Sequence, residues 1–297
     1  MKILLTADIH LRGADFGAPV LDELADAVSK KSPDVVVVVG DIGSPKYAAR
    51  HLVLLRNAVG DRPLAVALGN HDFWLESVGH AQFSNLDQII TRFWQEPARD
   101  VGAVLLDRET LDCGDLALVG GYGHFDLGFA ESGLCVQGME VTEAIYLSGG
   151  MNGLFWNDFR FIPNCATRVK AEAAEQAAAL ARRLDTALER RKSVLVAVHT
   201  CPWRELNGHP RRHTEVDILS AYSGNSLIGS ELERRAERIE LVVCGHTHMP
   251  VRERKIHGIP ALNIGADYGI FRGILYDSEH QTIQWLGLPV EVAGSAE

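Results

Sequence analysis

The sequence contains few cysteines. Five are present, at positions 113, 135, 165, 201 and 244, and no two of them form a Cys-x-x-Cys pair. An odd number without that spacing argues against a disulfide framework and against a thiolate metal site, and it suits a reducing compartment. Cys201 and Cys244 stand near histidines of interest, but we favour the plainer interpretation, that both are small buried side chains at strand ends.

Long apolar segments are also missing. The longest stretch without Asp, Glu, Lys or Arg, residues 144–157, has 14 residues, short of the roughly 20 that a membrane-spanning helix needs. Asp8 and His10 interrupt the apolar start of the chain and no small-residue cleavage site follows, so a signal peptide is not expected. We therefore expect a soluble, cytoplasmic protein with no membrane partner.

Positive charge is scarce as well. The chain has 29 Lys and Arg against 39 Asp and Glu, a formal net charge of -10, so a broad nucleic-acid-binding face is not expected. The remaining composition, with 46% hydrophobic residues, 28 Gly and 11 Pro, is that of a globular protein and excludes disorder, collagen and coiled coil as the main state. A length of 297 residues suits one large α/β domain or two small ones.

What the sequence does contain is a set of short apolar runs that each end in polar residues. They are residues 3–7, 35–39, 64–68, 194–198 and 241–244. Continuous apolar runs of this length predict strands buried on both faces. Helical patterns at residues 19–31 and 168–192 predict a layered α/β fold. Because ligands bind at the carboxyl ends of strands in such sheets, the polar clusters should converge on one edge.

One segment departs from this alternation. Residues 124–167 are rich in glycine and hold seven of the 21 aromatic residues. Two interpretations stay open, the core of an irregular insertion or a cap over the active-site edge. Residues 251–288 predict further strands, with a hairpin around residues 277–280. Without an internal repeat or a convincing linker, we expect one domain over residues 1–297.

The polar clusters carry metal-binding chemistry. The candidate donors are Asp8, His10, Asp41, Asn70, His71, His199, His246 and His248. Gly40 and Gly69 precede two of them and are expected to let the backbone turn sharply. Carboxylate, amide and imidazole donors suit Mn, Fe or Zn. This number exceeds the need of one ion, whereas two ions that share a carboxylate would use seven of them.

Each cluster taken alone has a plainer interpretation. Asp8 and His10 resemble a strand-end cap or a surface pair. Gly-Asp after a strand is common as a turn, and Asp72 either caps the next helix or orients His71. Two histidines as close as His246 and His248 are costly unless something binds them. The joint occurrence of all the clusters, each at the same end of a predicted strand, favours the metal site.

The ordered series resembles a known family. It consists of Asp8-Ile9-His10, Gly40-Asp41, Gly69-Asn70-His71-Asp72, His199 and Gly245-His246-Thr247-His248. This series is similar to that of the calcineurin-like metallophosphoesterase superfamily, in its phosphodiesterase-like branch. The resemblance implies a four-layered α/β/β/α sandwich around two divalent ions and hydrolysis by a hydroxide that bridges them.

The resemblance also implies a role for each residue. One ion would be held by Asp8, His10, Asp41 and His248. The second would be held by Asp41, Asn70, His199 and His246, with Asp41 bridging. His71 would be catalytic and face the phosphate.

The second motif bears on the substrate. Protein phosphatases of this superfamily extend it as Gly-Asp-x-Val-Asp-Arg-Gly, whereas this chain has Gly40-Asp41-Ile42-Gly43-Ser44-Pro45. A phosphodiesterase that acts on a small or nucleotide-like substrate is therefore favoured. The alternatives are a phosphomonoesterase or protein phosphatase, and a non-catalytic scaffold that keeps the fold. The presence of all seven donors argues against the scaffold.

A few further residues stay ambiguous. Arg204, Arg211 and Arg212 either contact a phosphate at the rim of the site or belong to a solvated loop, and the loop is favoured. His124 lies at the entrance to the insertion and is not assigned a catalytic role.

Overall fold

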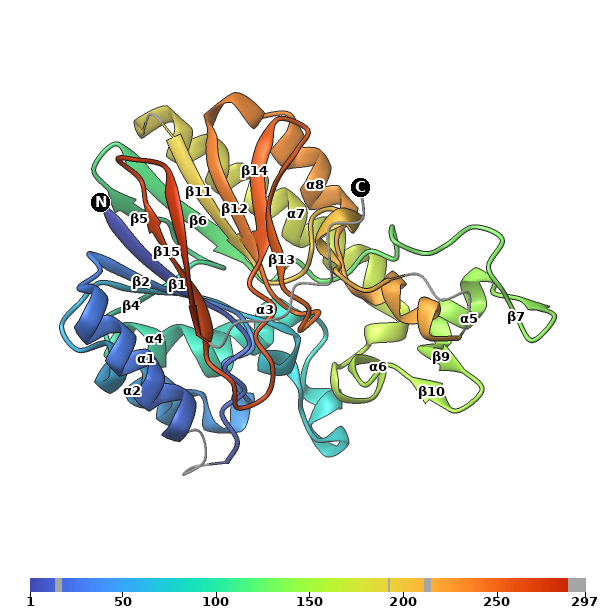
Figure 1. Ribbon diagram of the computed structural model, residues 1–297. Helices are drawn as coiled ribbons and strands as arrows, with labels where there is room; N and C mark the ends of the chain where they lie inside the picture. Colours follow the sequence, from blue (N-terminus) through green and yellow to red (C-terminus); the bar gives the residue numbers. More distant parts are fainter. Residues whose placement is uncertain (14–17, 192, 211–214, 288–297) are drawn as a thin grey trace.

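Two six-stranded sheets pack face to face in the computed structural model, which describes residues 1–13, 18–191, 193–210 and 215–287 (Figure 1). The first sheet has the order β16-β15-β1-β2-β3-β4 and the second β13-β14-β12-β11-β6-β5. The first comprises β1 (Lys2–Thr6), β2 (Val35–Val39), β3 (Leu64–Ala67), β4 (Ala103–Leu105), β15 (Arg272–Asp277) and β16 (Thr282–Gly287). The second comprises β5 (Leu111–Cys113), β6 (Leu116–Gly121), β11 (Ser193–Val198), β12 (Ile239–Cys244), β13 (Val251–Ile256) and β14 (Ile259–Asn263).

Four neighbouring strands in each sheet run parallel. β1 to β4 pair in parallel, as do β6, β11, β12 and β14, while β5, β13, β15 and β16 pair antiparallel. The hairpin predicted around residues 277–280 is present between β15 and β16. The five predicted strands are confirmed, since β1, β2, β3, β11 and β12 occupy the five apolar runs.

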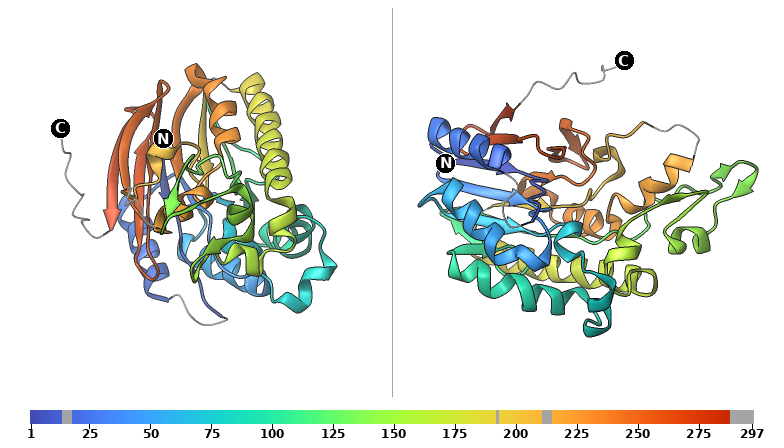
Figure 2. Two further views of the ribbon diagram at one scale, coloured as in Figure 1. Left: turned by 90° about the vertical axis from the view of Figure 1, so that its right-hand side faces the viewer. Right: turned by 90° about the horizontal axis from the view of Figure 1, so that it is seen from below.

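Helices cover the two outer faces (Figures 1 and 2). The longer ones are α1 (Ala18–Lys31), α2 (Ala48–Val59) and α4 (Gln95–Asp100) on the first sheet, and α7 (Cys165–Arg190) and α8 (Ser226–Glu233) on the second. A short helix, α3 (Leu86–Ile89), runs into a π-helical turn at Ile90–Trp94. Turns of 3₁₀-helix lie at Pro45–Tyr47, Asn70–Phe73, Ser77–Gln82, Arg204–Leu206, Glu215–Tyr222 and Ala236–Arg238. The α/β/β/α sandwich is therefore confirmed.

Alternation along the strands explains the four layers. In β2, Val35, Val37 and Val39 pack into the core between the sheets, whereas Val36 and Val38 pack against the helices. Because side chains of a strand point alternately to its two faces, a strand between two apolar layers must be apolar throughout. The uninterrupted valine run is the consequence of this double burial.

The segment of residues 124–167 projects from one end of the sheets (Figure 1). Its elements are β7 (Cys135–Val136), β8 (Met139–Glu140), α5 (Glu143–Ser148), β9 (Gly150–Met151), β10 (Leu154–Phe155) and α6 (Asp158–Phe161). Two short hairpins and two short helices lie within this predicted insertion, and the backbone between them is irregular. Phe125, Phe129 and Tyr146 are buried, whereas Phe155 is 49% exposed.

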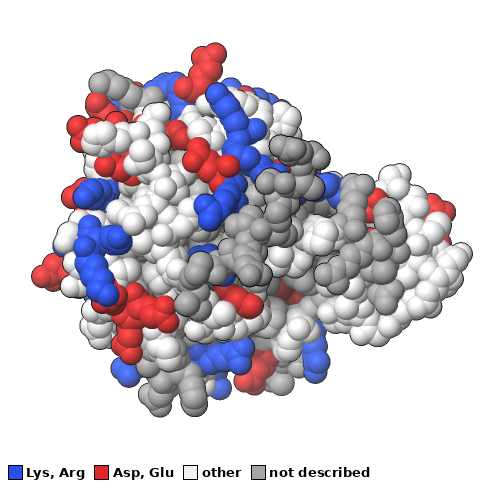
Figure 3. All heavy atoms as spheres, viewed as in Figure 1, with Lys and Arg blue, Asp and Glu red and all other residues white. Residues whose placement is uncertain are grey.

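Two surface properties complete the description. Lys and Arg are interspersed with Asp and Glu on the face seen in Figure 3. Among the described residues, the helices are too short or too polar to cross a membrane.

Candidate metal centre

The predicted donors lie in loops at the carboxyl ends of five strands. Asp8 and His10 follow β1, Asp41 follows β2 and Asn70 follows β3, all in the first sheet. The other three donors, at positions 199, 246 and 248, follow β11 and β12 of the second sheet. The expected convergence on one sheet edge was thus wrong in one respect, because the strand ends of two facing sheets meet. The donors approach one another from opposite sides.

The backbone of most of these donors is in the left-handed region. The φ angles are 54° at Asp8, 50° at His10, 53° at Asp41, 73° at His246 and 57° at His248. Such values cost a non-glycine residue on the order of 1–3 kcal/mol and persist only where the surroundings enforce them. Here the loops hold each other, since the amide of His10 donates to the carbonyl of Asp41 at 2.8 Å. Strain of this kind is typical of functional sites.

Two glycines of the motifs serve different purposes. Gly40 has a φ of 82°, so the predicted sharp turn is present there. Gly69 is extended, with a φ of -125°, so the turn predicted for it was wrong. A Cβ at Gly69 would lie 2.2 Å from Oδ1 of Asp41 and 2.8 Å from Nε2 of His199. Gly69 is required because a side chain would fill the space between the donors.

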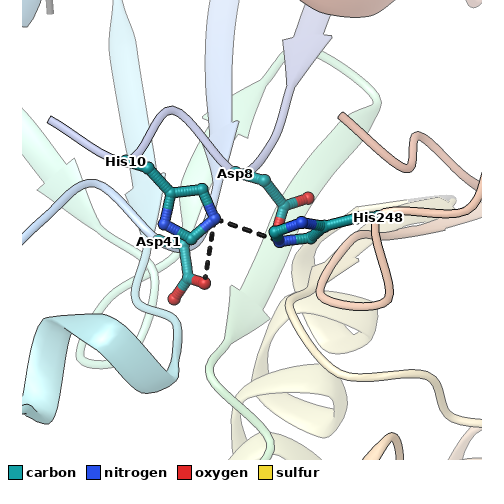
Figure 4. A group of neighbouring side chains, drawn as sticks. All are labelled: Asp8, His10, Asp41 and His248. Carbon is teal, nitrogen blue, oxygen red and sulfur yellow. Dashed lines mark hydrogen bonds and ion pairs between the residues drawn. The ribbon is translucent and has the colours of Figure 1, made fainter. Parts of the chain in front are cut away.

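The first donor set is formed by Asp8, His10, Asp41 and His248 (Figure 4). Their donor atoms all lie within 4.8 Å of one another. Nε2 of His10 is 3.1 Å from Nε2 of His248 and 3.6 Å from Oδ2 of Asp41. Nε2 of His248 is 3.7 Å from Oδ1 of Asp8. Four donor atoms thus face a common point.

The second donor set is formed by Asp41, Asn70, His199 and His246. Oδ1 of Asn70 is 3.2 Å from Nε2 of His199 and 3.0 Å from Nδ1 of His246. Those two imidazole nitrogens are 3.2 Å apart, and Nε2 of His199 is 3.4 Å from Oδ1 of Asp41. Asp41 therefore presents one carboxylate oxygen to each set.

Hydrogen bonds on the far side of the rings orient three of the histidines. Nδ1 of His199 is 3.0 Å from the carbonyl of Val39, and Nε2 of His246 is 3.1 Å from the carbonyl of Tyr222. Nδ1 of His248 is 3.2 Å from Oδ1 of Asp267. Metal-binding histidines generally have such a partner, which fixes the tautomer and turns the other nitrogen toward the ion.

Burial and mutual charge set the protonation of the cluster. Burial raises the pKa of Asp8 to about 6 and lowers the pKa of His10 and of His246 to about 3. Burial would also raise the pKa of Asp41, but the neighbouring His199 and His71 outweigh it and hold that pKa well below its usual range. Burial disfavours the charged form of His199, yet Asp41 raises its pKa to about 10.

The donor set fits divalent ions. Asp8 and Asp41 are each 1% exposed, and their ion pairs among the described residues are with histidines. Two buried carboxylates favour a cation between them, and ring nitrogens only 3.1–3.2 Å apart need a proton or an ion to share. A metal ion would displace the proton from His199 and satisfy both requirements.

His71 lies beside the two sets. Its amide donates to Oδ1 of Asp41 at 2.9 Å, and its Nε2 is 3.9 Å from Oδ2 of the same carboxylate. Its ring stacks on Trp74, with centroids 3.6 Å apart and an angle of 23°. Asp72 accepts from the amides of Gly69 at 2.7 Å and Gly43 at 2.8 Å. It therefore caps the start of its own turn, Asn70–Phe73, and the prediction that it caps the next helix was wrong.

Residues that the sequence did not single out complete the surroundings. Asp158 of α6 is 0% exposed and accepts hydrogen bonds from the side chains of Asn70, Trp74 and Trp156. The ring of Tyr268 lies 4.2 Å from that of His10. No local motif marks these residues, because they reach the site from segments with no metal-ligand pattern of their own.

Two clefts meet at the centre. One, of about 420 Å³ and here named the Arg12 cleft, is lined by residues that include His10, Arg12 and Trp74. The other, of about 460 Å³ and here named the Trp156 cleft, is lined by residues that include Trp156 and most of the donors. His71 and Tyr268 line both clefts.

Two of the ambiguous residues, Arg204 and His124, line neither cleft. Arg204 packs over the ring of Phe129 at 5.4 Å, whereas Arg211 and Arg212 lie outside the described residues. His124 is wholly buried, with Nδ1 3.0 Å from the hydroxyl of Tyr122. Cys201 and Cys244 are buried free thiols, as expected, and burial raises the pKa of Cys244 well above its usual range.

Comparison with known proteins gives the family of the chain. The family model of the calcineurin-like phosphoesterases matches residues 1–250. The chain belongs to this family. An uncharacterized metallophosphoesterase of Campylobacter jejuni is 36% identical over 76 residues, which are 25% of this chain and 20% of that protein. The chain is therefore matched over about a fifth of the length of that relative.

Solved structures share the fold of this calcineurin-like phosphoesterase. The phosphopantetheinyl hydrolase of Mycobacterium tuberculosis superposes with a TM-score of 0.67 and 18% identity, over 90% of each chain. A dimetal phosphatase from Danio rerio superposes with a TM-score of 0.53 and 15% identity, over 97% of this chain and 95% of its own. At these identities the likeness concerns the fold alone.

Proposed function

We propose that the protein is a dinuclear metal-dependent phosphodiesterase that acts on a small or nucleotide-like substrate. The observation that carries this proposal is the pair of donor sets that share Asp41, one oxygen to each set. Asp8, His10 and His248 would hold one ion together with Asp41. Asn70, His199 and His246 would hold the other. Mn, Fe or Zn all suit these donors.

Two divalent ions supply an activated water and a positive field for the phosphate oxygens. The protein's own residues would orient the substrate around them. Nε2 of His71 lies beside Asp41, at the junction of the two clefts, where it would contact the phosphate and the departing oxygen. Trp74 keeps the His71 ring in place by stacking against it.

Two clefts rather than one support a diester. A phosphodiester carries two ester groups, and a phosphate placed at His71 and Tyr268 would direct one into the Arg12 cleft and the other into the Trp156 cleft. Among the described residues that line the clefts, Arg12 is the single Lys or Arg. One fixed positive charge besides the ions suits a monoanionic diester better than a dianionic monoester.

Rates on two chromogenic substrates test this proposal. Metal-reconstituted protein should hydrolyse bis-p-nitrophenyl phosphate with a higher kcat/KM than p-nitrophenyl phosphate. We expect a difference of at least about tenfold, which corresponds to about 1.4 kcal/mol of transition-state stabilisation. Metal content measured on the same sample should be two ions per chain. Faster hydrolysis of the monoester would instead favour a phosphomonoesterase.

The proposal extends to the setting of the enzyme. One domain over residues 1–297 is supported by the contribution of Trp156 and Asp158, from the projecting segment, to the surroundings of the centre. A reducing, cytoplasmic location is supported by the five free cysteines. The partner is a small-molecule phosphoester rather than a nucleic acid duplex or a membrane, which agrees with the net charge of -10.

A further inference from the structure

Three N–H groups converge on the buried carboxylate of Asp158. Nδ2 of Asn70 donates to Oδ1 at 2.9 Å and Nε1 of Trp74 donates to the same oxygen at 2.7 Å. Nε1 of Trp156 donates to Oδ2 at 2.9 Å. The carboxylate is 0% exposed, so these neutral donors stand in for its hydration. Burial of this carboxylate costs free energy, and the three hydrogen bonds fix the side chains of Asn70, Trp74 and Trp156 around it.

The contact with Asn70 decides which way its amide points. With Nδ2 on Asp158, Oδ1 is turned toward His199 and His246. If the amide rotated by half a turn, its oxygen would meet the carboxylate oxygen, acceptor against acceptor, and its NH₂ group would face the ligand position. A hard or borderline cation binds the oxygen of an amide and not its NH₂ group.

We propose that Asp158 is the positioning residue of the second ion: it holds Asn70 with its oxygen toward the metal. This inference rests on the proposed dinuclear centre. It also gives the segment of residues 124–167 a defined task, because Asp158 comes from α6 of that segment whereas Asn70 follows β3. The first donor set has no contact of this kind with Asp158 among the described residues and should be independent of it.

A second buried carboxylate offers a matched control. Glu172 of α7 is 5% exposed, accepts from Nε of Arg168 at 2.9 Å and from the amide of Leu86 at 3.3 Å, and contacts none of the seven donors among the described residues. If Asp158 served the fold alone, its loss and the loss of Glu172 should affect metal binding alike.

Calorimetric titration with Mn²⁺ tests the inference without relying on activity. Metal-free wild type, Asp158→Ala, Asp158→Asn and Glu172→Gln are compared for the number of ions bound and the Kd of each. We expect two ions for wild type and for Glu172→Gln. In Asp158→Ala one ion should keep its Kd, while the Kd of the other rises by about 10–100-fold, the usual effect of losing a partner behind a metal ligand. Asp158→Asn keeps an oxygen for Asn70 and should recover most of that loss.

The outcomes separate the inference from the function on which it rests. Wild type with fewer than two ions overturns both. Two ions in wild type and in Asp158→Ala, with equal Kd values, overturn the positioning role alone. A loss as large in Glu172→Gln, or an equal weakening of both ions in Asp158→Ala, overturns it too.

A second pair of variants decides the matter if Asp158→Ala does not fold. Asn70→Asp places two carboxylates side by side, and adding Asp158→Asn removes their repulsion, because the new amide can donate to the carboxylate at position 70, although the hydrogen bond from Trp74 is then lost. The double variant should bind the second ion more tightly than Asn70→Asp alone. Equal affinities would overturn the inference.

Discussion

The two donor sets differ in charge and in enclosure. The first contains two carboxylates, Asp8 and Asp41, whereas the second has only the shared Asp41 together with an amide and two imidazoles. In the second set His199 is 0% exposed and its ring is held by a backbone carbonyl. In the first set the side chain of His248 is 21% exposed and its partner, Asp267, is itself 53% exposed.

The comparison separates two properties of a metal site, its affinity for a cation and the rigidity of its donors. A second carboxylate strengthens the attraction for a cation, so charge favours the first set for affinity. Enclosure and orientation by backbone carbonyls should keep the second set rigid, so we expect an ion bound there to exchange slowly and to contribute to the stability of the fold. The variants below are ordered from the largest expected effect to the smallest.

Removing Asp41, the residue common to both donor sets, should abolish metal binding by both sets. Asp41→Ala deletes an oxygen from each set, so we expect both ions to be lost and diester hydrolysis to fall by more than about 10³-fold, beyond the effect of a single electrostatic donor. Metal analysis and hydrolysis of bis-p-nitrophenyl phosphate check this. Retention of one tightly bound ion would show that the sets do not depend on the shared carboxylate.

His71 belongs to neither set and should affect turnover alone. His71→Ala is expected to keep two ions while kcat falls by about 10²–10⁴-fold, the range for loss of a group that exchanges a proton with substrate. Metal content and kcat are measured on the same preparation. Loss of an ion along with activity would place His71 among the ligands instead.

The sequence could predict the donors but not what surrounds them. An apolar run followed by Asp, Asn or His is a local pattern that locates the strand ends and their polar residues, and the resemblance to the family then implies which seven of these would be donors. The contact between Asn70 and Asp158 spans 88 positions, and no local pattern announces it. Gly69 was assigned a turn because sequence reveals a glycine but not the neighbour that its missing Cβ would strike.

The four layers were expected from the resemblance to the family, whereas the apolar runs alone predict only an α/β fold. Runs such as β2 disclose that a strand is buried on both faces, but not which sheet it joins, and the division of the donors between two sheets came only with the structure. The left-handed backbone of His246 and His248 likewise depends on loops that meet in space.

Removing one histidine from each set tests enclosure directly. His199→Ala and His248→Ala should each cost one ion. In chelator-treated protein, His199→Ala should lower the free energy of unfolding by about 1–3 kcal/mol, because it leaves a cavity and an unpaired carbonyl at Val39. His248→Ala should stay within about 0.5 kcal/mol of wild type. If urea denaturation gave the same loss of unfolding free energy for both variants, the two sets would not differ in enclosure.

His124 supplies the reference for what burial alone does to a histidine, since it is not one of the donors. Burial lowers its pKa to about 3 from an ordinary value of 6.5, so the unfolded chain binds more protons than the folded one between these values. The contribution of this neutral ring to stability is therefore complete above pH 6.5 and is lost as pH falls, at up to about 1.4 kcal/mol per pH unit. His124→Asn keeps a polar group near the Tyr122 hydroxyl and removes this titration. Urea denaturation of chelator-treated protein should show wild type losing about 2 kcal/mol relative to the variant between pH 6.5 and 5. A constant difference would mean that burial does not keep His124 neutral, and the low pKa of His246 would then need a cause other than enclosure.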